Sequence, residues 1–86
     1  MARFRKKPVV VEAVQWFKHG DHPAVMPATF EQAVGVIPGV LWEHCGWVQT
    51  PEGGHVVAPG NWVITGVQGE HYPCRADIFA ATYEPV

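Results

Sequence analysis

Residues 59–79 constrain the fold of this chain most, because turn residues there alternate with short apolar runs. Pro59-Gly60 predicts a first turn, and the glycine-flanked segment 66–69 predicts a second bend. The runs beside these bends, 62–65 and 70–74, carry the β-branched and aromatic residues that favour strands. Asp77 follows at a position that suits the start of a single helical turn over 77–81. We therefore expect short strands joined by tight turns.

The N-terminal part of the chain predicts one strand followed by a loop. Residues 8–17 are rich in valine and aromatic side chains, which favour a strand. Because both faces of that strand are largely apolar, we expect it to be central in a sheet or covered by a helix. Residues 18–28 contain one glycine and two prolines among polar side chains, so they predict a loop without a regular element.

One amphipathic helix is predicted over residues 29–37. Its apolar residues recur at the spacing of one helical face. Thr29 followed by Gln32 resembles a capping box at the N-terminus, and Pro38-Gly39 predicts the end of the helix.

The remaining segments complete a mainly antiparallel arrangement. Residues 41–50 alternate weakly, 51–54 form a turn signal and 55–58 a short return strand, which together predict a hairpin. Residues 82–86 are expected to add a closing edge strand. The sequence therefore predicts an α+β fold, with a small curled antiparallel sheet or partial barrel and one packed helix.

Length and composition indicate one packed domain over residues 1–86. A chain of 86 residues has too little apolar surface for a second core. Hydrophobic residues make up 48% and charged residues only 16%, so the chain is built to pack rather than to stay disordered. Such a sparsely charged surface is compatible with a homo-oligomer, a common source of stability for small chains.

Charge is distributed unevenly along the chain. Four basic residues lie within residues 1–7, whereas the rest has two basic and eight acidic residues, a formal charge of −6. A binder of the phosphate backbone needs several lysines and arginines on one face, so the body argues against a nucleic-acid partner. We interpret residues 1–7 as a flexible, solvated basic arm; contact of this arm with nucleic acid or an acidic partner is the alternative.

Segments that target proteins to membranes or for secretion are not predicted. Glu12 and Gln15 interrupt the apolar run that follows the basic arm, and no stretch approaches the roughly 20 apolar residues of a membrane span. We therefore expect a cytoplasmic protein whose two cysteines, Cys45 and Cys74, are reduced and packed. A disulfide between them is left open.

The sequence favours a metal site or a thiol enzyme less than it favours a binding protein. Five side chains could bind zinc: His44, Cys45, His55, His71 and Cys74. Their spacing lacks a paired ligand motif, so no cofactor or metal is predicted. Cys74 with His71 and Asp77 could imitate a thiol enzyme. Only Arg75 is near enough in sequence to favour a thiolate, so no catalytic residue is predicted.

Aromatic side chains point to a binding role. Four tryptophans and two tyrosines are too many large rings for one small core to hide, and Trp, Tyr and Arg concentrate binding energy at interfaces. The predicted ligand- or partner-binding residues belong to the segment that opened this section: Trp62, Glu70, Tyr72, Arg75 and Asp77.

The same segment resembles a family of small uncharacterised proteins of tailed bacteriophages and prophages. The resemblance rests on short motifs shared with the family: Pro59-Gly60-Asn61-Trp62, Gly66-Val67-Gln68-Gly69-Glu70, Tyr72-Pro73-Cys74, Asp77-Ile78-Phe79, Thr82-Tyr83-Glu84 and the opening Phe4-Arg5-Lys6-Lys7-Pro8-Val9-Val10-Val11-Glu12-Ala13. Asn61 replaces the usual Asp, and Ala76 replaces a Pro. The resemblance implies a phage-encoded protein in the host cell and no established activity.

Two functions of different class are compatible with these features. The first prediction is a phage accessory protein that acts by non-covalent binding, as an interaction or inhibitor module against a host or phage protein. The alternative is a protein that sequesters a nucleotide-like small molecule and so counters host immunity. In that alternative, Trp62 and Tyr72 would stack on a planar ligand and Arg75 would hold an anionic group.

Overall fold

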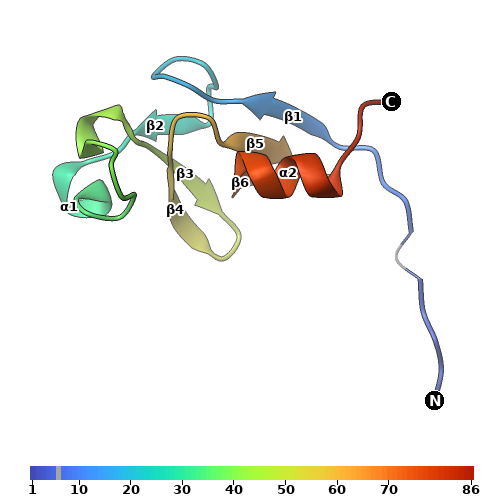
Figure 1. Ribbon diagram of the computed structural model, residues 1–86. Helices are drawn as coiled ribbons and strands as arrows, with labels where there is room; N and C mark the ends of the chain where they lie inside the picture. Colours follow the sequence, from blue (N-terminus) through green and yellow to red (C-terminus); the bar gives the residue numbers. More distant parts are fainter. Residues whose placement is uncertain (6) are drawn as a thin grey trace.

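The strands form two three-stranded antiparallel sheets in a computed structural model that describes residues 1–5 and 7–86. Neither sheet closes into a barrel (Figure 1). The predicted α+β class with a curled antiparallel sheet is confirmed, and the strands form two such sheets rather than one. The strands, in chain order, are β1 (Glu12–Gln15), β2 (Val25–Pro27), β3 (Gly46–Thr50), β4 (Gly53–Val57), β5 (Trp62–Thr65) and β6 (His71–Cys74).

The first sheet has the order β1-β5-β6. The expectation that the first strand is central was wrong: β1 is an edge strand, and β5 takes the central place. The two middle residues of β5, Val63 and Ile64, are both buried. The second sheet covers one face of this strand, and another segment of the same molecule covers the other. Residues 8–11 run on from β1 beyond its pairing with β5 (Figure 1).

The second sheet has the order β2-β3-β4. Its β3–β4 hairpin turns at the predicted glycine-rich segment, with Thr50 opposite Gly53. The predicted loop over residues 18–28 was wrong in part, because Val25–Pro27 pair with β3 as the short edge strand β2. Tertiary pairing decides here: Pro27 lacks an N–H group, which an edge strand tolerates and a central strand does not.

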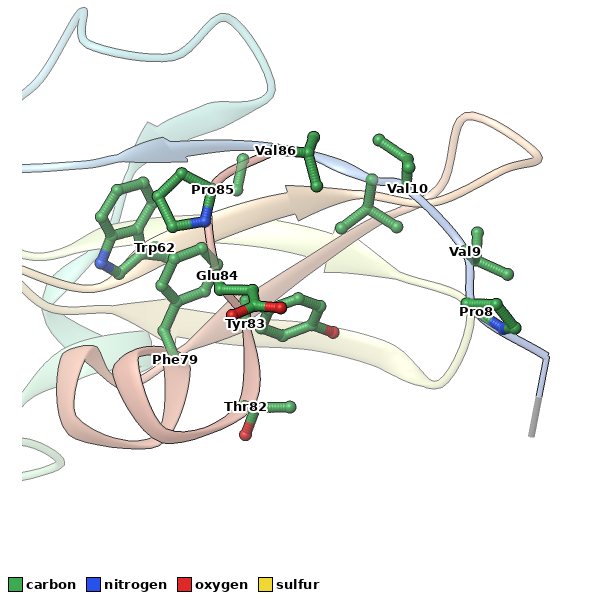
Figure 2. Close-up of a pocket in the computed structure, with 12 residues that line it drawn as sticks. Pro8, Val9, Val10, Trp62, Phe79, Thr82, Tyr83, Glu84, Pro85 and Val86 are labelled. Carbon is green, nitrogen blue, oxygen red and sulfur yellow. The ribbon is translucent and has the colours of Figure 1, made fainter. Parts of the chain in front are cut away.

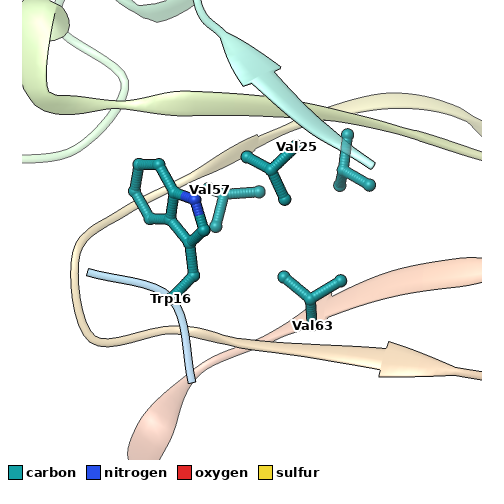
Figure 3. Packing of buried hydrophobic residues seen from close by; sticks show 5 residues of the cluster. Trp16, Val25, Val57 and Val63 are labelled. Carbon is teal, nitrogen blue, oxygen red and sulfur yellow. The ribbon is translucent and has the colours of Figure 1, made fainter. Parts of the chain in front are cut away.

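A core of buried apolar side chains lies between the two sheets. Trp16 and Val63 come from the first sheet and its flank, and valines of β2, β3 and β4 meet them: Val25, Val48 and Val57. Figure 3 shows the labelled members of this cluster converging from opposite ribbons. Since Val63 faces this core, its neighbour Trp62 faces the opposite, outer side of the first sheet.

The first helix is shorter than predicted. α1 spans Phe30–Ala33, and its capping box is present: the Thr29 hydroxyl accepts from the Gln32 backbone N–H while the Gln32 side chain accepts from that of Thr29. Helical backbone ends before Gly35, whose φ of 70° is left-handed. A 3₁₀ turn, η1, spans Trp42–His44 and packs with α1 around a second buried cluster, Ala28, Ala33 and Cys45.

The second helix is longer than predicted and covers the outer face of the first sheet. α2 spans Ala76–Thr82, and residues 83–86 form no strand, so the expected closing edge strand was wrong. Figure 1 places α2 against β5 and β6. With seven residues it is the longest helix in residues 1–5 and 7–86, and no helix there could cross a membrane.

The basic arm leads away from both sheets. Residues 1–5 and 7 are exposed and lack regular secondary structure, and Lys6 lies outside the described residues. The molecule measures 47 Å along its longest axis against 29 and 24 Å along the others, and the arm accounts for part of this length (Figure 1).

Candidate functional site: an apolar groove beside the second helix

An open groove of about 780 Å³ lies where α2, β5 and the start of the chain meet. Three segments that are distant in sequence form its walls: residues 8–11 with Ala13, Trp62 on β5, and the end of α2 with the C-terminal residues. Figure 2 shows these side chains gathered between the α2 ribbon and the N-terminal segment: Pro8, Val9, Val10, Trp62, Phe79, Thr82, Tyr83, Glu84, Pro85 and Val86.

Stacked aromatic rings form one wall of this groove. Trp62 and Phe79 stack with their ring centres 4.1 Å apart and their planes 7° from parallel. Phe79 in turn stacks on Tyr83, with ring centres 5.0 Å apart and a 23° angle. Phe79 lies in α2, and Tyr83, four residues on, caps the C-terminal end of the helix, so the two rings lie on the same side of it. The stack fixes α2 to the sheet and leaves the Tyr83 end of the stack open to solvent.

The opposite wall is made of apolar residues that water can reach. Val10 is 74% exposed, and Val9 and Val86 are also exposed. Tyr83, at the end of the aromatic stack, is 36% exposed. The groove therefore exposes apolar side chains from both ends of the chain to water.

Charge is sparse in the groove. Glu84 is the single charged residue among those that line it, and none of them is lysine, arginine or histidine. Arg75 lies instead beside Cys74 in a smaller hollow, where its guanidinium group pairs with Asp77 at 2.8 Å. Both partners of that pair are well exposed, so the pair contributes little to stability.

Glu70 lies in the bend between β5 and β6, and Tyr72 follows it on β6, opposite Ile64. The Glu70 carboxylate accepts a hydrogen bond from the Gln68 N–H at 3.2 Å, and the Gly66 N–H donates to the Glu70 carbonyl at 2.8 Å. Partial burial raises the pKa of the Tyr72 hydroxyl, and the nearby carboxylates of Glu52 and Glu70 raise it further. Glu70 thus closes the turn around Gly66.

The residues considered for thiol chemistry are not assembled for it. His71 and Cys74 are three residues apart on β6, so their side chains point to opposite faces of the sheet. Burial raises the pKa of the Cys74 thiol, and Asp77 raises it further, which disfavours the reactive thiolate. Both cysteines are free, and no three His, Cys, Asp or Glu side chains of residues 1–5 and 7–86 converge on a metal position.

The predicted binding residues are therefore distributed over three places. Trp62 lines the groove, Glu70 and Tyr72 lie in and just after the β5–β6 bend, and Arg75 and Asp77 form the exposed ion pair. Sequence reasoning missed Phe79 and Tyr83 as binding residues. Their four-residue spacing was a usable signal, but a helix ending at residue 81 separated Tyr83 from it.

No known protein family, curated protein or solved structure matches this chain. The chemistry of the groove must therefore indicate the function.

Proposed function

We propose that this protein is a small phage-encoded accessory protein that binds a host or phage protein non-covalently through the apolar groove. It would do so in the host cytoplasm, as an interaction or inhibitor module. The matching partner segment carries an apolar side chain, which enters the groove, flanked by basic side chains. The phage setting comes from the motif resemblance of residues 59–84, and the mode of binding comes from the groove.

The observation that carries this proposal is the exposed apolar surface around the aromatic stack. Trp, Tyr and Arg side chains that become desolvated near the centre of a protein interface contribute most of the binding energy in many complexes. Trp62 and Phe79 are held rigidly by their stacking, so a partner would lose little by ordering them.

The negative charge of the body predicts that the partner segment is basic. The body outside the basic arm carries a formal charge of −6, and Glu84 lies at the groove itself. A net negative body with a carboxylate at the groove favours a partner with complementary basic side chains and speeds its association.

The groove gives less support to the nucleotide-sequestering alternative. Trp62 and Phe79 already use one ring face each on one another, so little free ring surface remains for a planar base. A phosphate would also need a cation, and the groove residues include none, while Arg75 is engaged by Asp77 elsewhere. Calorimetric titration with cyclic and ADP-ribose-type nucleotides would detect this function directly.

Site-specific photo-crosslinking tests the proposal. A photoreactive phenylalanine analogue replaces Tyr83 at the groove or, as the control, Gln49, an exposed residue of β3 outside the groove. The purified variants are irradiated in host lysate with and without phage proteins. We expect position 83 to yield a stoichiometric protein adduct that position 49 does not yield.

Two results would contradict the proposal. The first is an equal, weak background of protein adducts from both positions. The second is saturable heat from a nucleotide together with loss of that heat in a Trp62→Ala variant, which would assign the groove to a small molecule.

A further inference from the structure

We propose that a second copy of this chain occupies the groove, with the basic arm of each protomer lying along β1 and the groove of its partner. This inference rests on the proposed function, because it names the partner for the same surface. It assigns a role to two features that have no packing or pairing partner within one molecule, the exposed arm and the free edge of β1.

The arm has the chemistry that the groove is expected to bind. Phe4 is 94% exposed and lies between Arg3 and Arg5, so the arm presents one large apolar side chain with basic neighbours. Its formal charge is opposite to that of the body, and Glu84 lines the groove. Within its own molecule the arm leads away from the sheets, so its apolar side chain is free for a partner (Figure 1).

The free edge of β1 supplies the backbone partner. β1 pairs with β5 on one side and is the end of its sheet on the other. Such an edge presents unpaired N–H and C=O groups and pairs readily with another strand. Residues 8–11 extend this edge beyond β5 with exposed valines, so two copies can join edge to edge about a two-fold axis, each using the same surface.

An antiparallel register centred between Val9 and Val10 satisfies both features. It sets Phe4 of one copy opposite Gln15 of the other, and Gln15 pairs on its far side with Trp62. Residues directly opposite each other share a face of the sheet, so Phe4 lies on the groove side with Trp62. The same register sets Lys7 opposite Glu12, an oppositely charged cross-strand pair. An extended arm of seven residues spans roughly 23 Å, which is long enough to reach the partner's groove.

Sedimentation equilibrium of the full chain tests the inference. We expect a dimer that weakens as salt rises from about 0.1 to 0.5 M, because the arm–body attraction is screened. Phe4→Ala should raise the dimer dissociation constant about a hundredfold, roughly tenfold for each of the two arms. The control is Val67→Ala, which removes an exposed apolar side chain outside the groove and should leave the constant unchanged.

Charge reversal tests the register. Lys7→Glu and Glu12→Lys should each weaken the dimer, because each places like charges opposite one another. The double variant should restore it. Single variants that weaken the dimer without restoration in the double variant would overturn the register and with it the inference.

Other outcomes separate this inference from the proposed function. A chain that is monomeric at every concentration, or a dimer that survives Phe4→Ala and both reversals, overturns the second copy as the occupant. If position 83 then crosslinks to a host or phage protein, the groove remains a protein-binding surface with another partner. A photo-adduct of twice the monomer mass that is lost with Phe4→Ala supports both.

Discussion

The His22 imidazole is buried and accepts a hydrogen bond, so its protonation destabilises the fold. The ring is 8% exposed, and its Nδ1 accepts a hydrogen bond from the Ala24 N–H at 3.0 Å. It also meets the ring of His71 edge to face, with centres 5.3 Å apart. Burial lowers the pKa of His22, and the neighbouring His71 lowers it further.

We predict that acid destabilises the fold through His22. Its folded pKa lies below the unfolded value of about 6.5, so the unfolded chain binds more protons, and stability present above that pH is lost as the pH falls. Urea unfolding between pH 8 and pH 5 measures the slope. His22→Asn keeps an acceptor near the Nδ1 position without titrating and should flatten the slope, whereas the exposed His55→Asn should not. An unchanged slope in His22→Asn would contradict this assignment.

Gly46 is a residue whose missing side chain matters. A Cβ there would overlap the Cγ1 of Val25 and approach the Trp16 ring to 3.0 Å. We predict that Gly46→Ala lowers the free energy of unfolding by about 1–3 kcal/mol through overpacking. Chemical denaturation gives the value, and Gln49→Ala on the same strand should change it by less than about 0.5 kcal/mol.

Double-mutant analysis distinguishes local overlap from a general weakness of β3. Val25→Ala makes room for the added methyl group, so its combination with Gly46→Ala should cost less than the sum of the two single changes. Strict additivity would show that the overlap is not the cause.

At the scale of elements, α2 depends on its contact with β5. Seven residues are too few for an isolated helix to be stable in water. The helix has no side-chain N-cap hydrogen bond, and the Phe79 ring stacked on Trp62 supplies the packing instead. The groove therefore exists only as long as this stack holds α2 in place.

Truncation of Phe79 is predicted to undock α2. Phe79→Ala removes the middle ring of the stack and should lower the free energy of unfolding by about 2 kcal/mol, with loss of helical circular dichroism. Hydrogen exchange of the Phe79 and Tyr83 amides, which bond to Arg75 and Phe79 carbonyls, should accelerate. Phe79→Leu keeps an apolar contact and should retain much of the protection; full retention in Phe79→Ala would show that α2 is held by other contacts.

Elements with local signals were predictable from sequence. The hairpin around residues 51–54, the strand at 62–65 and the Thr29 capping box depend on turn residues or on side chains three positions apart, and all three are present. β2 was missed because three residues containing Pro27 form a strand only when β3 lies alongside. The edge position of β1 likewise depends on which distant strand pairs with it, and its own residues do not encode that.

The groove was only partly predictable for the same reason. Trp62 was identified from its residue type, whereas the wall opposite it comes from residues 8–11, more than fifty positions away. Tyr83 was assigned to a strand, whereas it caps α2, which extends to Thr82, and its ring stacks on Phe79.

At the scale of the whole molecule, an acidic body with an exposed apolar groove carries a basic arm that leads away from the sheets. The body carries −6 and the arm four positive charges, and the exposed valines of residues 8–11 lie between them. A single chain leaves the groove, the edge of β1 and Phe4 uncovered. The central claim is that protein segments of apolar and basic character are recognised at Trp62.

Fluorine NMR of the protein labelled with 5-fluorotryptophan tests this claim most directly, because its four tryptophans report on different places. A synthetic peptide of residues 1–11 is titrated into the labelled protein, and the same peptide with Phe4→Ala serves as control. We predict that the Trp62 signal shifts saturably while those of Trp16, Trp42 and Trp47 stay, and that the control peptide binds more weakly. A Trp62 signal that does not move, or saturable shifts at Trp42 or Trp47 instead, would contradict the account.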